Sequence, residues 1–229
     1  MACGEALLRD RPGVGQGEAN LPDDAGPPGH APTMRAKHAA SLIVWRIDNG
    51  EPHMLMGMRG AKHRFMPNRL VFPGGRVDPA DMTAPCATPI SPRTEAMLRK
   101  NASAALARGL VAAAARELQE ETGLSLGTPP RLDALHYLAR AVTPPGQPIR
   151  FNARFFAVGA EHVSGTGGGD GELESLRFYA MSEALGFDLA SPTRKVLGRL
   201  DHWLAMTESE RNAEARMPVL IRDQGWRME

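Results

Sequence analysis

The sequence predicts one α/β or α+β domain, and three observations support this fold class. Short apolar runs typical of strands alternate with longer Ala-, Leu- and Glu-rich stretches typical of helices. The chain has 229 residues, of which 42% are hydrophobic, so it is long enough to bury one sizeable core. No apolar run reaches the roughly 18 residues that a membrane-spanning helix needs.

The composition also argues against some classes of binding partner. The formal net charge is +1 and aromatic residues make up 5% of the chain, which argues against a nucleic-acid-binding protein. We therefore expect no nucleic acid and no membrane as partners. Cys3 and Cys86 lie in irregular segments without metal-ligand spacing, so we expect no disulfide and a reducing, cytoplasmic location.

The first elements can be read in order along the chain. Residues 1–37 are rich in Gly, Pro, Asp and Ala without any period, and we expect a disordered leader before a single domain at 38–229. "HAASLIVWRI" and "PHMLMGMR" predict two strands, and the "DNGE" between them predicts a hairpin turn. A third short strand, "RLVF", leads into "PGGRVD", and a loop follows at 79–92.

Helices and strands then alternate to the end of the chain. Residues 93–122 have a helical composition, with a break or bend expected at Gly109 and a C-cap at Gly123. Strands are expected at 131–142 and 151–159. The segment "GTGGGDG" predicts a flexible loop, "ELESLRFYA" a strand, and "SPTRKVLGRLDHWLAM" a helix with a proline in its first turn.

Three carboxylates gather near the end of the first long helix. Glu117, Glu120 and Glu121 are spaced i, i+3 and i+4, which places them on one helical face. One interpretation is a solvated acidic face, on which Arg116 pairs with Glu120. The other is a site for a hard divalent cation such as Mg²⁺, which prefers oxygen ligands. The helix alone does not decide between them.

The segment upstream favours the cation. In "VFPGGRVD", Gly74 and Gly75 directly follow an apolar strand, where the backbone must pass close to another group. A strand, a Gly-Gly pair and a carboxylate-bearing helix together form a frame for a metal-bound phosphate substrate.

The same residues resemble the signature of the Nudix hydrolase family, the Nudix box. That signature runs from Gly through five residues to Glu, then through seven more to Arg-Glu-aliphatic-x-Glu-Glu-x-Gly-aliphatic. The stretch from Arg116 to Leu124 matches its second half in full, and Gly75 matches its first glycine. The Arg follows the glycine by 14 residues in the box but by 116 − 75 = 41 here, an excess of 27, which predicts an insertion at about 79–108. Counted back from Arg116, the expected Glu is absent, because position 108 is Arg.

An interrupted box, with "RFMPNRLVFPGGRVDPAD" and "TPPGQPIRFNARFFAV" on either side, is similar to the branch of peroxisomal coenzyme A diphosphatases. The resemblance implies an α/β/α sandwich with a mixed β-sheet between helices. It also implies a metal-dependent hydrolase that cleaves a diphosphate linkage in a small-molecule nucleoside diphosphate derivative. A coenzyme A-like substrate is the first expectation; ADP-ribose and NADH stay open.

An alternative is a catalytically silent Nudix-fold sensor of nucleotides, or an interaction module. The Arg at position 108 favours it, and the complete set of glutamates opposes it.

The resemblance also assigns roles to residues. Mg²⁺ or Mn²⁺ would be held by Glu117, Glu120, Glu121 and the carbonyl of Gly75, beside Arg116 of the box. A homodimer is one possible oligomeric state for a protein of this kind.

The general base and the substrate contacts are further expectations. The base would be Glu117 itself or one of Glu172 and Glu174, for which alternation on a surface strand is the other interpretation. The residues expected to contact substrate are Arg59, Arg64, Arg76, Arg150 and Phe151.

Overall fold

The computed structural model describes residues 35–60, 68–221 and 225–229, and the structural statements below refer to these ranges. The predicted leader at 1–37 falls almost entirely outside them, and Lys37 already belongs to the first strand. Arg64 and Cys3 also lie outside the described residues.

The predicted N-terminal hairpin is confirmed. Strand β1 (Lys37–Asp48) pairs antiparallel with β2 (Glu51–Arg59) through Asn49 and Gly50. Both turn residues have positive φ, 50° and 81°, as a type I′ turn requires. The Asn-Gly pair therefore fixes the register of the two strands.

Nine described strands form one mixed sheet. Its order is β3-β2-β1-β6-β5-β8-β9, with β4 paired to β1 and β7 paired to β2. β1 runs parallel to β6, and β5 runs parallel to β8, while the other pairs are antiparallel. The remaining strands are β3 (Leu70–Val71), β4 (Gly74–Arg76), β5 (His136–Val142), β6 (Phe151–Gly159), β7 (Leu173–Ala180), β8 (Pro218–Ile221) and β9 (Trp226–Met228).

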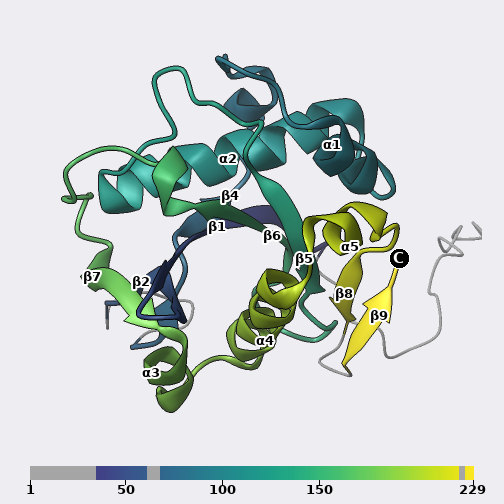
Figure 1. The fold of residues 1–229 in the computed structure, drawn as a ribbon. Coiled ribbons are helices and arrows are strands. Elements are labelled where there is room, and N and C mark those ends of the chain that lie inside the picture. The colour runs from purple at the N-terminus through teal and green to yellow at the C-terminus, as the bar shows by residue number, and fades with distance from the viewer. Residues whose placement is uncertain (1–34, 61–67, 222–224) are drawn as a thin grey trace, which may run out of the picture. The chain divides into compact units, whose positions relative to one another are not determined.

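Helices cover both faces of this sheet, which confirms the predicted α/β/α sandwich. Figure 1 shows α1 (Pro92–Arg99) and α2 (Ala104–Thr122) on one side, with α3 (Met181–Gly186) and α4 (Ser191–Ala205) on the other. Alternate residues of β1 enter different cores: Leu42 packs with α2, and Ile43 packs with α4. The short elements are η1 (Pro79–Thr83), η2 (Ala160–His162) and α5 (Glu208–Ala213). Within the described ranges, no helix combines the length and the apolar character needed to cross a membrane.

The helical stretch expected at 93–122 is two helices, and its break is not at Gly109. The chain leaves helical geometry after α1, and Ser103 caps α2, its Oγ accepting from the Leu106 N–H at 3.2 Å. α2 continues unbroken through Gly109. A Cβ at Gly109 would lie 3.0 Å from Met82 Cγ, so the glycine allows η1 to pack closely against the helix.

The segment containing α1, within the predicted insertion, holds the C-terminal part of the chain. Arg93 donates to the carbonyl of Asn212 at 2.7 Å, and Lys100 donates to the carbonyl of Ala215. Asn101 Nδ2 donates to Glu229 Oε2 at 3.1 Å. The segment therefore has a structural role, which is to hold the C-terminal part of the chain by hydrogen bonds.

Candidate active site

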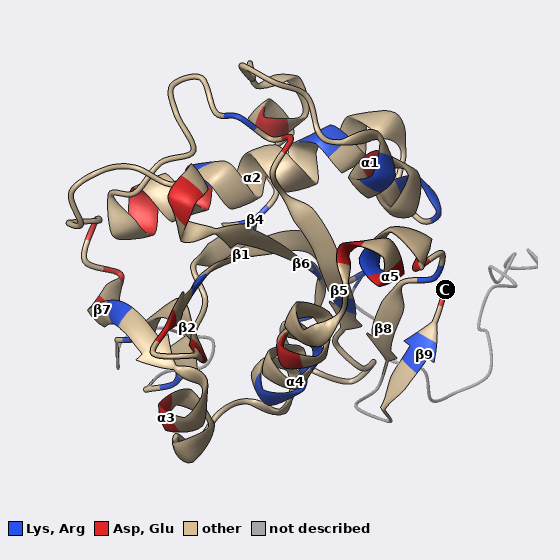
Figure 2. Ribbon diagram, viewed as in Figure 1, with Lys and Arg blue, Asp and Glu red and all other residues tan. Residues whose placement is uncertain are grey.

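The three glutamates of α2 have different surroundings. Their side chains are exposed by 14% at Glu117, 51% at Glu120 and 2% at Glu121. Figure 2 shows the acidic residues of α2 gathered toward its C-terminal end. A solvated acidic face thus describes Glu120 alone, because the other two carboxylates are taken out of water.

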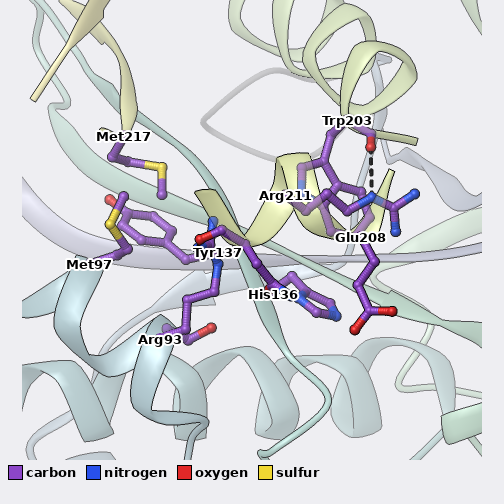
Figure 3. A pocket seen from close by; sticks show the side chains of 10 residues that line it. Arg93, Met97, His136, Tyr137, Trp203, Glu208, Arg211 and Met217 are labelled. Atoms are coloured by element: carbon purple, nitrogen blue, oxygen red, sulfur yellow. Dashed lines mark hydrogen bonds between the residues drawn. The ribbon is translucent and has the colours of Figure 1, made fainter. Parts of the chain in front are cut away.

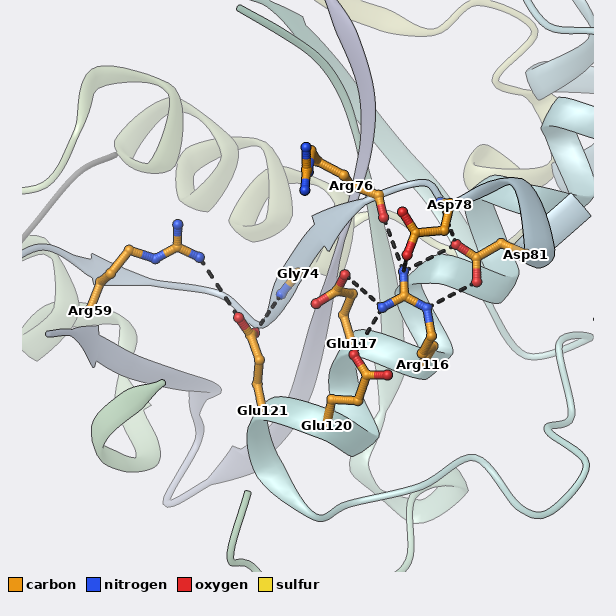
Figure 4. Close-up of polar contacts among 9 residues, drawn as sticks. All are labelled: Arg59, Gly74, Arg76, Asp78, Asp81, Arg116, Glu117, Glu120 and Glu121. Atoms are coloured by element: carbon orange, nitrogen blue, oxygen red, sulfur yellow. Dashed lines mark hydrogen bonds and ion pairs between the residues drawn. The ribbon is translucent and has the colours of Figure 1, made fainter. Parts of the chain in front are cut away.

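Glu121 is held beneath the glycine pair by two contacts. Its Oε2 accepts from the Gly74 N–H at 2.8 Å, and its Oε1 lies 3.7 Å from Arg59 Nη2 (Figure 4). Burial raises the pKa of Glu121 to about 8, although the Gly74 hydrogen bond and the Arg59 charge act in the opposite direction. An ionised Glu121 is therefore undercompensated, and a nearby cation would stabilise it.

Glu117 lies directly against Gly75. A Cβ at position 75 would stand 2.3 Å from Glu117 Oε1, so any side chain there would displace the carboxylate. Burial raises the pKa of Glu117, Arg116 lowers it, and the charges of Glu120 and Glu172 raise it further. Only glycine at 75 keeps this carboxylate close to β4.

Arg116 organises the charges beside it. Its Nη1 donates to Glu117 Oε1 and to Glu120 Oε2, each at 2.9 Å, which confirms the expected i, i+4 pair with Glu120. Its Nη2 donates to the carbonyl of Arg76 at 3.0 Å. Arg116 thus orients two of the glutamates from the side.

Asp81 is a residue that the sequence analysis missed. Arg116 Nε and Nη2 donate to the two oxygens of the Asp81 carboxylate at 3.0 and 3.1 Å (Figure 4), and Asp81 is 4% exposed. Hydrogen bonding to Asp81 is the main reason why the pKa of Arg116 is raised. This buried bidentate pair holds the guanidinium in a fixed plane.

Asp81 is thus a candidate for the acidic position that the resemblance places after the glycine, in place of position 108. Arg108 is exposed on α2, whereas Asp81 stands six residues after Gly75, where the signature places its first Glu. Counting forward from the glycine would have found it. With Asp81 in that position, the predicted insertion would lie between Asp81 and Arg116, and Arg108 would no longer favour a silent sensor.

Glu117 and Glu121 open onto a cleft of about 640 Å³, which Glu120 does not line. Seven of the predicted site residues line it, namely Arg59, Gly75, Arg76, Glu117, Phe151, Glu172 and Glu121. The rest of its wall is mostly apolar, including Val71, Phe72, Val142, Ile149, Phe155 and Leu220. The cleft is thus lined both by charged groups and by hydrophobic groups, several of them from β5, β6 and β8.

Other predicted residues stand elsewhere. Arg150 donates to the carbonyl of Thr143 through Nε and Nη2, both at 3.2 Å, and does not line the cleft. Glu174 is exposed on β7 and also lies off the cleft wall, whereas Glu172 is half-buried within it. The geometry thus separates the two candidate bases.

Arg59 carries the clearest sign of a missing partner. Its Nε–H is buried and has no hydrogen-bond partner among the residues that the structure describes. Its Nη2 lies 3.7 Å from Glu121 Oε1. A buried donor left unpaired costs about 1–3 kcal/mol, so an anion entering the cleft beside Arg59 would recover that energy.

The donor set fits a hard divalent cation. No three His, Cys, Asp or Glu side chains of the described ranges already stand close enough together to form a metal site. However, Glu117 and Glu121 line one cleft, both have raised pKa values, and all their donor atoms are oxygens. Burial is the main cause of the raised pKa values and carboxylate repulsion adds to it, and a cation between the two side chains would offset both.

A second cavity, of about 280 Å³, contains none of the predicted site residues (Figure 3). Arg93 of α1 and Arg211 of α5 line it, together with His136, Tyr137 and Trp203. Arg211 donates to the carbonyls of Trp203 and Leu204, both at 3.0 Å, and stacks 4.2 Å from the Trp203 ring centroid. The Arg211 side chain in this cavity is therefore used in hydrogen bonds to backbone carbonyls and in packing against Trp203.

Comparisons with known proteins identify the fold. No protein-family model matches the sequence, and no curated protein matches it. A Nudix hydrolase from Alicyclobacillus acidocaldarius superposes with a TM-score of 0.57 at 25% identity, over 73% of this chain and 91% of that one.

Two more distant structures were also found. A MutT Nudix hydrolase from Burkholderia pseudomallei has a TM-score of 0.47 at 18% identity, over 73% of this chain and 99% of that one. The Nudix domain of Shewanella oneidensis NrtR, complexed with ADP ribose, has a TM-score of 0.48 at 12% identity, over 77% and 94%. The similarity to the Alicyclobacillus protein and the layered sheet together show that this chain has the Nudix fold.

Proposed function

We propose that the protein is a divalent-metal-dependent hydrolase that cleaves the diphosphate linkage of a nucleoside diphosphate derivative. One observation carries the proposal: Glu117, Glu121 and Glu172 line the same cleft as Arg59, whose buried Nε–H lacks a partner among the described residues. Crowded carboxylates suit a cation, and the unpaired arginine suits an anion. A diphosphate with its metal ion supplies both.

Glu117, Glu120 and Glu121 would hold Mg²⁺ or Mn²⁺, with the carbonyl of Gly75. When bound, such an ion neutralises phosphate oxygens and activates water. Glu120 lies off the cleft wall on the half-exposed side of α2, where Arg116 holds it, so it would have to leave Arg116 to bind the ion. Arg116 and Asp81 keep the helix face in register with the glycine pair.

Other residues of the cleft would bind the substrate and accept a proton from water. Arg59 and Arg76 bind the diphosphate oxygens from the cleft wall. Glu172 accepts a proton from the attacking water, whose oxygen bonds to one phosphorus while the bond from that phosphorus to the bridging oxygen breaks. The bridging oxygen leaves with the electron pair on the second phosphate.

The apolar part of the cleft bears on the substrate. Phe155, Ile149 and Leu220 line the cleft with hydrophobic groups besides the charged ones, and Thr143 and Gln147 add a few polar groups. A long, largely uncharged substituent on the diphosphate fits such a lining, which supports a coenzyme A-like compound as the first candidate. Phe151 supplies an aromatic face for a base.

The test measures cleavage of coenzyme A, ADP-ribose and NADH with Mg²⁺ or Mn²⁺. Wild type is compared with Glu172→Gln and with Glu174→Gln, which is a matched control because Glu174 is exposed off the cleft. Loss of a general base lowers kcat by about 10²- to 10⁴-fold, so only Glu172→Gln should lose activity. No metal-dependent cleavage of any compound by the wild type would sink the proposal.

A further inference from the structure

The glycine-rich segment before β7, for which the composition predicts a flexible loop, is docked on the C-terminal end of α2 by backbone hydrogen bonds. The Gly168 N–H donates to the Thr122 carbonyl at 3.0 Å, and the Asp170 N–H donates to the Glu120 carbonyl at 2.9 Å. The last carbonyls of a helix have no partner within the helix. The segment supplies two of the missing donors.

Close approach explains one of the glycines. A Cβ at Gly169 would lie 2.0 Å from the Glu121 carbonyl oxygen and 2.5 Å from the Thr122 nitrogen, and both of these atoms are backbone. A backbone contact of that length cannot be relieved by rotating a side chain. Any other residue at 169 would therefore push the segment away from the helix. Gly167, two residues earlier, has open space around its Cβ position.

Asp170 joins this docked backbone to Glu172. The Asp170 N–H is bound to the helix, and the Asp170 Oδ1 accepts from the Glu172 N–H at 2.9 Å. Glu172 follows two residues later on the wall of the cleft, together with Glu117 and Glu121. One chain of hydrogen bonds therefore runs from the end of α2 to the backbone of Glu172.

We infer that Gly169 and Asp170 are positioning residues, which fix Glu172 relative to the carboxylates of α2 by docking residues 168–170 on the end of that helix. The inference rests on the proposed function, because it gives Glu172 its task. The segment docks on the last turns of α2, beside the residues that carry the acidic side chains, so one helix end sets the position of both. A displacement of about 1 Å at a reacting group can cost about 10²-fold in rate.

The experiment compares Gly169→Ala with Gly167→Ala, the same substitution in the same segment. Gly169→Ala should lower kcat about 10- to 100-fold with KM changed by no more than about threefold, whereas Gly167→Ala should match the wild type. Amide hydrogen exchange on the metal-free protein gives a second readout. The amides of Gly168 and Asp170 should be protected in the wild type and should lose protection in Gly169→Ala.

A double variant separates positioning from a general structural role. If Gly169 acts through Glu172, adding Gly169→Ala to Glu172→Gln should cause no further loss of kcat. Full additivity of the two losses would overturn the inference. So would wild-type kcat in Gly169→Ala once its amides have lost protection.

Substitutions at Asp170 provide a second test in case Gly169→Ala does not fold. Asp170→Ala removes the acceptor for the Glu172 N–H and should lower kcat, while Asp170→Asn retains an Oδ1 acceptor and should restore it. Equal kcat in Asp170→Ala and the wild type would overturn the inference. These failures leave wild-type turnover intact, whereas failure of the proposed function appears as a wild-type protein without turnover.

Discussion

The two cavities differ in how far their charged side chains are paired with other groups of the protein. In the small cavity, Arg93 and Arg211 donate to backbone carbonyls at 2.7–3.1 Å, and Arg211 also stacks on Trp203. In the large cleft, the Arg59 Nε–H has no partner among the described residues, and burial raises the pKa of Glu121 to about 8. The two arginines of the small cavity are paired with protein groups, whereas Arg59 and Glu121 of the cleft are undercompensated.

This difference helps to distinguish a structural cavity from a functional one. Buried charges that are fully hydrogen-bonded add to the stability of the fold. Charges that are crowded or unpaired reduce it, and such groups persist where a ligand completes them. We therefore expect substitutions in the cleft to cost activity, and substitutions in the small cavity to cost stability.

The largest expected effect is that of Glu121→Gln. Loss of this carboxylate should lower kcat about 10³-fold, because the metal would supply several kcal/mol of charge stabilisation. The metal-free protein should be no less stable, since a Gln oxygen can still accept from Gly74 without a buried charge. Thermal unfolding with and without Mn²⁺ checks this: Mn²⁺ should raise the unfolding temperature of the wild type only. A large loss of stability in the metal-free variant would contradict the comparison.

Asp81→Asn should affect both activity and stability, because Asp81 links the two kinds of role. Removing its charge leaves Arg116 half-buried with weaker partners, which should lower the free energy of unfolding by about 1–3 kcal/mol. As Arg116 moves, Glu117 and Glu120 lose their orientation, and kcat should fall about 10-fold.

The matched control is Asp78→Asn. Asp78 is 61% exposed and lies 3.9 Å from the same guanidinium. An exposed pair contributes about 0–1 kcal/mol, so urea unfolding should distinguish the two variants clearly. Equal effects at the two positions would show that the buried pair has no special role.

Asp81 also shows how far the sequence alone can lead. The three glutamates and Arg116 were predicted because helical spacing is local, and α2 confirms that spacing. Asp81 was missed because the signature was counted back from Arg116 across the insertion. Forward from Gly75, it stands at the expected position, since 81 − 75 = 6. An insertion keeps each half of a motif in register with itself, so each half must be counted from its own end.

The other differences come from contacts distant in sequence. Glycine is common both in flexible loops and where backbones approach closely, so composition did not reveal that residues 168–170 dock on α2. Strands β8 and β9 were not predicted. Both are very short, and α1 from the inserted segment holds the chain beside them, which no local pattern records.

Arg211→Ala tests the small cavity. The guanidinium caps the end of α4 through the carbonyls of Trp203 and Leu204, so its loss should cost about 1–2 kcal/mol. That corresponds to an unfolding temperature lower by about 2–8 °C, with kcat unchanged. Arg131→Ala is the control, because Arg131 is 67% exposed and pairs only with a nearby surface carboxylate. Loss of kcat in folded Arg211→Ala would break the distinction between the cavities.

The smallest expected effect is a pH dependence at the wall of the small cavity. Burial, followed by the charges of Arg211 and Arg93, lowers the pKa of His136 below its ordinary value of 6.5, and Glu208 is the carboxylate that lines the same cavity. The unfolded chain therefore binds the proton first as the pH falls. Stability from the neutral imidazole is present above about pH 6.5 and is lost as the pH falls through the lower, folded value.

Urea unfolding at about pH 7.5 and pH 5.5 measures this effect. Between these two pH values the urea midpoint should fall less in His136→Gln than in the wild type or in His53→Gln, whose ring lies outside this cavity. A pH-dependent fall as large in His136→Gln as in the wild type would mean that neither burial nor the charges of Arg211 and Arg93 lower the pKa of His136, and that the arginines of this cavity do not act on the ring.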